Sequence, residues 1–93
     1  MNQADIQVRH LPDQRRYTVF SDGEEAGFTE YRETGSLRLF EHTEIHPAFR
    51  GRGLTNPLFQ TALDDSRAAG FQVEAECSAV VRFMLKQQQQ QSE

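Results

Sequence analysis

Apolar and polar residues alternate along the first half of the chain, which is the pattern of β-strands with one buried face. Two such stretches lie at residues 6–9 and 26–32, residues 16–20 are rich in β-branched and aromatic residues, and residues 37–45 form a fourth, longer candidate strand. Turn-forming residues separate them, including a hairpin sequence at residues 21–24, and Pro47 ends the last stretch. The pattern predicts a four-strand antiparallel meander.

The period changes in the second half, where apolar residues recur at helical spacing. One helix is predicted over residues 58–69, with Asn56 as its N-cap, Pro57 as its first residue and Gly70 as its stop. A fifth strand is expected at residues 71–75. Ser78 is expected to cap a last helix whose apolar stripe has four members: Val80, Val81, Met84 and Leu85.

This order of elements predicts an α+β fold, with an antiparallel four-strand meander, a helix, a fifth strand parallel to the fourth, and a C-terminal helix. A chain of 93 residues leaves room for one core, so residues 1–86 are expected to form a single domain. Residues 87–93 are rich in glutamine and have nothing to bury, so we expect a disordered tail there.

Composition excludes several classes of function. The net charge of −4 argues against a nucleic-acid binder, and no segment is apolar enough to span a membrane. A single cysteine, Cys77, excludes an internal disulfide framework, and no signal-peptide pattern is visible, so we expect a cytoplasmic protein. Histidine and cysteine lack metal-ligand spacing, and no P-loop motif occurs, so neither a metal site nor an NTPase is expected. The strand aromatics could imitate an RNA-stacking sheet, but no basic stripe accompanies them.

A turn rich in arginine and glycine lies between the fourth strand and the first helix. Glycine lets the backbone approach a ligand, a helix N-terminus presents unpaired N–H groups, and guanidinium donors suit phosphate oxygens. On an acidic chain, such a turn favours a small anionic ligand. Its six residues are Arg50, Gly51, Arg52, Gly53, Leu54 and Thr55.

With its flanking segments, the chain resembles the GNAT superfamily of acyl-CoA-dependent N-acetyltransferases, and most closely its very short single-domain branch. The resemblance is carried by residues 42–54 (HTEIHPAFRGRGL), by the helix that follows them and by residues 76–83 (ECSAVVRF). It extends over roughly residues 5–86.

The resemblance implies that the turn at residues 50–55 wraps the pyrophosphate of coenzyme A with backbone N–H groups. It also implies that the fourth strand splays from the fifth and that the pantetheine arm pairs with backbone near Glu44 and Ile45. Two residues depart from the family pattern. Thr55 stands where glycine or alanine is usual, and Pro57 offers no N–H, so we expect weaker or slightly shifted binding.

Acetyl transfer to an amine requires a base, an oxyanion stabiliser and a proton for the departing thiolate. His42 and Glu44 share a strand face, and either could be the base; the alternatives are a histidine bonded to backbone and a solvated glutamate. Cys77 lies where the fifth strand passes into the last helix, whose N-terminus favours thiolate. It could form an acetyl-cysteine, protonate the thiolate of CoA, line the pocket, or be a small buried residue.

The sequence therefore predicts an N-acetyltransferase with acetyl-CoA as co-substrate and no metal. The acceptor is an unidentified amine, either a small molecule or part of a protein or peptide, and a monomer or weak dimer is expected. The alternative is a non-catalytic acyl-CoA-binding or sensing module, because a chain this short lacks much of the acceptor-binding apparatus of longer relatives.

Overall fold

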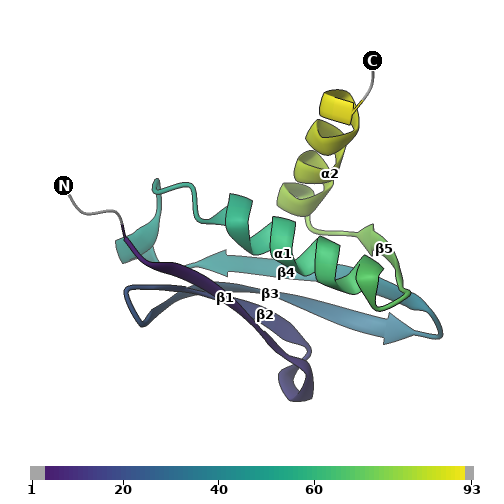
Figure 1. The fold of residues 1–93 in the computed structure, drawn as a ribbon, viewed down its shortest axis with the longest axis horizontal. Coiled ribbons are helices and arrows are strands. Elements are labelled where there is room, and N and C mark those ends of the chain that lie inside the picture. The colour runs from purple at the N-terminus through teal and green to yellow at the C-terminus, as the bar shows by residue number, and fades with distance from the viewer. Residues whose placement is uncertain (1–3, 92–93) are drawn as a thin grey trace.

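The computed structural model describes residues 4–91, and its strands and helices follow the predicted order (Figure 1). The five strands form one sheet in chain order; the first four are antiparallel, and the fifth is parallel to the fourth. The predicted α+β fold is thus confirmed. The strands are β1 (Ile6–Leu11), β2 (Arg16–Ser21), β3 (Glu24–Thr34), β4 (Leu37–Ile45) and β5 (Gln72–Ala75). The helices are α1 (Thr55–Ala68) and α2 (Ser78–Gln91), with short 3-10 turns η1 (Pro12–Gln14) and η2 (Pro47–Phe49).

The hairpin between β2 and β3 shows how the local sequence determines the turn that joins two strands. Asp22 and Gly23 both have positive φ, 51° and 85°. Two such residues form the turn whose twist matches that of the flanking strands, and Asp-Gly is a favoured pair there. The hairpin predicted at residues 21–24 is therefore present.

Helix α1 crosses one face of the sheet, and α2 follows β5 and packs beside it (Figure 1). The rings of Phe59 on α1 and Phe83 on α2 meet edge to face, with centroids 5.6 Å apart. No helix within residues 4–91 covers the opposite face of the sheet. The core lies between α1 and the sheet, and its fully buried members include Tyr17, Val19, Phe40, Leu58 and Leu63.

The start of α1 differs from the prediction. The helix begins at Thr55, its N-cap is Leu54, and no side chain caps it. Asn56 and Pro57 are therefore its second and third residues. Pro57 is tolerated there because N–H groups in the first turn have no partner within the helix. Ala69, the last residue of the predicted range, lies just beyond the helix and is exposed.

The start of α2 also differs. Ser78 is the first helical residue, and the Cys77 carbonyl accepts the N–H of Val81, so Cys77 and not Ser78 occupies the N-cap position. The apolar stripe is rotated from the predicted one: Phe83 and Met84 pack on the core, whereas Val81 and Leu85 are exposed. The helix continues to Gln91, so most of the glutamine run is helical here, while residues 92–93 lie outside the described part. The domain boundary at residue 86 stays a prediction.

A β-bulge in β4 changes which side chains face the helices. Glu30 of β3 pairs with His42, but the next pair is Tyr31 with Phe40, so Glu41 has no partner in the ladder. A bulge inserts one extra residue and reverses the alternation beyond it. Phe40 is buried under α1, and after the bulge the odd-numbered residues of β4 face the helices.

Candidate active site

The sheet opens into a gap between β4 and β5. The two strands pair over only four residues each, ending at Phe40 and Ala75. The N–H groups of Glu76 and Cys77 then both donate to the Phe40 carbonyl, at 2.9 and 3.3 Å. β4 continues to Ile45, so residues 41–45 have no strand beside them on this edge within the described chain. We call this unpaired edge of β4, beside the start of α2, the slot.

The backbone groups of β4 that face the slot belong to Thr43 and Ile45. The N–H of His46 donates to the Ala26 carbonyl on β3, at 2.8 Å. Backbone groups along an antiparallel ladder alternate between the two neighbours, so those of Glu44 face β3 and those of Thr43 and Ile45 face the slot. An extended ligand in the slot would pair with Thr43 and Ile45, whereas the resemblance named Glu44 and Ile45.

Cys77 lies at the inner end of the slot. Its Sγ is 3.4 Å from Oγ1 of Thr43, which is itself 2.9 Å from Oγ1 of Thr29. Burial alone would raise the pKa of the Cys77 thiol. The Thr43 hydroxyl, the N–H groups of Val80 and Ala79 and the positive charge of Arg82 outweigh that effect, so the pKa lies below its ordinary value. The side chain that the sequence singled out is thus placed to give up a proton.

The two predicted bases lie together but on the other face of β4. His42 Nε2 is 3.2 Å from Glu44 Oε2, and both side chains are more than half exposed. The His42 ring lies 6.0 Å from that of Phe28, a residue of the helix-free face. Thr43 and Cys77, by contrast, meet on the helix face. The structure therefore brings His42 to Glu44 and places Cys77 across the strand from both.

The turn before α1 requires its glycines. Gly51 and Gly53 have φ of 80° and 71°, a conformation that other residues rarely adopt. Arg50 is turned back toward β4, where its Nε donates to the Ile45 carbonyl at 3.1 Å. The Arg52 guanidinium lies over the Phe49 ring, 5.1 Å from its centroid. Both arginines therefore have contacts that shape the turn.

The backbone N–H groups of this turn have no internal acceptor. Within the described chain, none of residues 51–55 donates a backbone hydrogen bond, whereas the Asn56 N–H already donates to the Gly53 carbonyl. Pro57 has no N–H. The run of free donors thus ends where α1 starts, at the positive end of the helix dipole.

A cleft beside the turn was missed by the sequence reasoning. It lies between the start of α1 and the middle of α2, has a volume of about 200 Å³, and continues into a second hollow of about 320 Å³. Arg82 and Lys86 line it from α2, and neither forms an ion pair within residues 4–91. Their spacing of four residues places both on one helix face, which is the signal that could have identified them. Asn56, Phe59 and Phe83 complete the walls.

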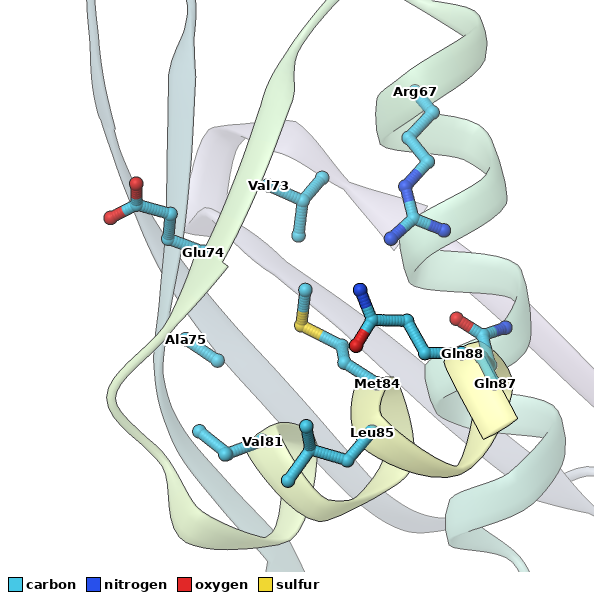
Figure 2. A pocket seen from close by; sticks show the side chains of 9 residues that line it. All are labelled: Arg67, Val73, Glu74, Ala75, Val81, Met84, Leu85, Gln87 and Gln88. Carbon is cyan, nitrogen blue, oxygen red and sulfur yellow. The ribbon is translucent and has the colours of Figure 1, made fainter. Parts of the chain in front are cut away.

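A further hollow, of about 470 Å³, lies between the end of α1, β5 and α2 (Figure 2). Val73 and Met84 point into it, with Arg67 above them, whereas the Glu74 carboxylate points to the other side of the strand. None of the candidate residues of the turn or the slot lines it. Among the described residues, no group of histidine, cysteine and acidic side chains is arranged to hold a metal ion. No helix of residues 4–91 is long and apolar enough to cross a membrane.

Comparison with protein families identifies the family of the chain. The sequence profile of the GCN5-related N-acetyl-transferases matches residues 16–92, which extend from β2 to beyond the end of α2. No curated protein matches the chain significantly. The matched segment contains the slot, the turn and the cleft.

Proposed function

The chain belongs to the GCN5-related N-acetyltransferase family, and we propose that it transfers the acetyl group of acetyl-CoA to an amine in the slot between β4 and β5. The observation that carries this proposal is the run of free N–H groups at residues 51–55, which ends at the N-terminus of α1 and borders a cationic cleft. A pyrophosphate presents the negatively charged oxygens that such a turn binds.

The cationic cleft suits the ribose phosphate of coenzyme A, which the turn does not bind. The molecule carries a pyrophosphate and a separate ribose phosphate, and the cleft next to the turn offers Arg82 and Lys86. Phe83, which is only partly buried, adds ring surface against which an adenine can pack. The pantetheine arm would then extend along β4, with its amides paired to the backbone of Thr43 and Ile45.

With the pantetheine arm along this edge of β4, the thioester would lie within reach of side chains from both faces of the strand. An amine that approaches from the helix-free face meets His42 and Glu44, either of which can accept its proton directly or through a water. When the carbon–sulfur bond breaks, the sulfur of CoA takes the electron pair and the Cys77 thiol supplies its proton. Solvent then returns a proton to Cys77, so the reaction balances as amine and acetyl-CoA giving amide and free CoA.

A binding experiment tests the assignment of the cleft. We expect Arg82→Gln and Lys86→Gln each to weaken acetyl-CoA binding about tenfold, as loss of one ion pair with phosphate implies, and to weaken binding of 3′-dephospho-CoA much less. Arg67→Gln is the matched control, because it removes an exposed cation of α1 that does not line this cleft. Equal losses for both ligands, or a loss in the control, would contradict the assignment.

A second measurement separates an enzyme from a binding module. Free CoA release is followed with a panel of amines, from small polyamines to lysine peptides. Turnover with any of them supports the transferase. Tight acetyl-CoA binding without turnover in the whole panel would favour the sensing module.

A further inference from the structure

Two buried threonine hydroxyls connect Cys77 to the interior of the sheet. Thr29 is fully buried on β3, and its Oγ1 lies 3.3 Å from the His42 carbonyl and 2.9 Å from Thr43 Oγ1. Thr43 Oγ1 in turn lies 3.4 Å from Cys77 Sγ. The chain of contacts is therefore thiol, hydroxyl, hydroxyl and carbonyl.

Counting protons fixes the direction of this chain. Each hydroxyl has one proton to donate, and a carbonyl can only accept. Thr29 therefore donates to His42, Thr43 donates to Thr29, and the Cys77 thiol donates to Thr43. Every donor has one acceptor, and the series ends on a carbonyl of the β3–β4 ladder.

Loss of the thiol proton reverses the series. A thiolate only accepts, so the Thr43 proton must turn toward Cys77, and the Thr29 proton can then turn toward Thr43. Because Thr29 is fully buried, no solvent competes for its proton. Two rotations thus supply the thiolate with a donor and leave the Thr43 oxygen with a partner.

We infer that Thr43 and Thr29 are a two-hydroxyl relay that stabilises Cys77 in both of its protonation states. The inference rests on the proposed role of Cys77 as the proton donor to CoA. A group that gives a proton to the departing sulfur must be stable after giving it, and the relay meets that need without a second charge. Arg82 on α2 is the charged group that also acts on the thiol, whereas β3 and β4 contribute only neutral hydroxyls.

Cysteine alkylation tests the relay directly. Cys77 is the only cysteine, so the rate of iodoacetamide modification of the free protein reports its thiolate fraction alone. We expect Thr43→Val to lower the rate at neutral pH about tenfold, the factor that one hydrogen bond to a charged group carries, and to move the pH profile upward. Thr43→Ser should restore the rate. Thr61→Val, which removes an exposed hydroxyl of α1, should leave it unchanged.

Thr29 provides the decisive comparison. The relay predicts a slower rate in Thr29→Val and an unchanged pH profile in Thr29→Ser. It also predicts a double variant no slower than Thr43→Val alone, because Thr29 acts only through Thr43. A wild-type rate in Thr29→Val, or additive losses in the double variant, overturns the relay. Thr29→Ala replaces Thr29→Val if circular dichroism shows the latter unfolded.

Alkylation also keeps this inference separate from the proposed function, because it needs no acetyl-CoA. Shifted alkylation profiles in a protein without acetyl transfer would support the relay and reject the transferase. If the threonine variants keep the wild-type alkylation profile in an active transferase, the relay is rejected and the transferase is supported.

Discussion

Cys77 Sγ and Thr43 Oγ1 lie 3.4 Å apart where β4 and β5 have already separated. The contact joins the N-cap of α2 to the part of β4 that, among the described residues, has no strand beside it on that edge. It places a thiol beside the unpaired edge of β4, on the helix face of the sheet. A small side chain there can touch both a thioester and the interior of the sheet.

Replacement of Cys77 by alanine is expected to lower kcat about 100-fold, the lower range for loss of a general acid, with acetyl-CoA affinity unchanged. The reason is that the proposed site puts Cys77 beside the reacting sulfur and apart from the groups proposed for the phosphates. The measurement is single-turnover release of free CoA beside a binding titration.

Intact mass then separates the two chemical roles of the cysteine. Wild-type protein quenched rapidly after mixing with acetyl-CoA should carry no acetyl group if Cys77 is only an acid. An adduct that appears and decays at the rate of turnover would instead establish the acetyl-cysteine route. Unchanged kcat in Cys77→Ala would exclude both roles.

Gly27 is expected to be essential for the shape of the slot. A Cβ at this position would lie 2.4 Å from the Glu44 carbonyl oxygen and 2.6 Å from Ile45 Cδ1, so β4 would have to move. We expect Gly27→Ala to lower the free energy of unfolding by about 1–3 kcal/mol, as overpacking does, and to weaken acetyl-CoA binding. Urea unfolding and a titration check the two effects. Wild-type binding in a destabilised variant would show that Ile45 does not hold the ligand.

Much of the fold was predictable because local signals agreed with each other. Residues 37–45 were expected to form a long strand that Pro47 interrupts, and β4 has those bounds. Asp22 and Gly23 fit their turn for conformational reasons. The start of α1 was missed because no side chain caps it, so Asn56 and Pro57 gave a misleading signal.

The site was less predictable, because an irregularity decides its arrangement. Strict alternation places His42 and Glu44 on the face of Phe40, toward the helices. The bulge at Glu41 reverses this and sends Thr43 there instead. A bulge depends on pairing with β3, which the sequence of β4 alone does not reveal. Similarly, the cleft is formed by two helices that are distant in sequence, and only their packing brings it together.

Arg38 is expected to be the most costly charge to remove. It is 6% exposed, and its Nη1 donates to the Tyr17 hydroxyl and to Ser66 Oγ, at 3.0 and 2.9 Å, while Nε donates to Glu33. Arg38→Met should lower the free energy of unfolding by about 3 kcal/mol, because partners of a buried charge lose their hydrogen bonds. Arg32→Met, at an exposed ion pair with Glu41, should cost less than about 1 kcal/mol. Equal costs in urea unfolding would refute this ranking.

The imidazole of His10 is expected to make stability depend on pH. Its ring stacks on that of Tyr17, with centroids 4.1 Å apart, and its Nε2 lies 2.6 Å from the Tyr31 hydroxyl. Burial, together with the positive charge of Arg38, lowers the pKa of His10, although the nearby carboxylate of Asp65 acts in the opposite direction. The fold therefore favours the neutral ring.

The direction in which stability changes with pH follows from the lowered pKa of His10. An unfolded chain binds the proton at the ordinary histidine pKa of 6.5, whereas the folded chain binds it only at lower pH. The stabilisation is therefore fully present above that value and is lost as the pH falls below it, through the pKa of the folded state. Urea unfolding between about pH 5.5 and 7.5 stays above most carboxylate titration, so a fall in stability there reports the imidazole. His10→Gln should flatten the slope, and a variant with the wild-type slope would assign the dependence to another group.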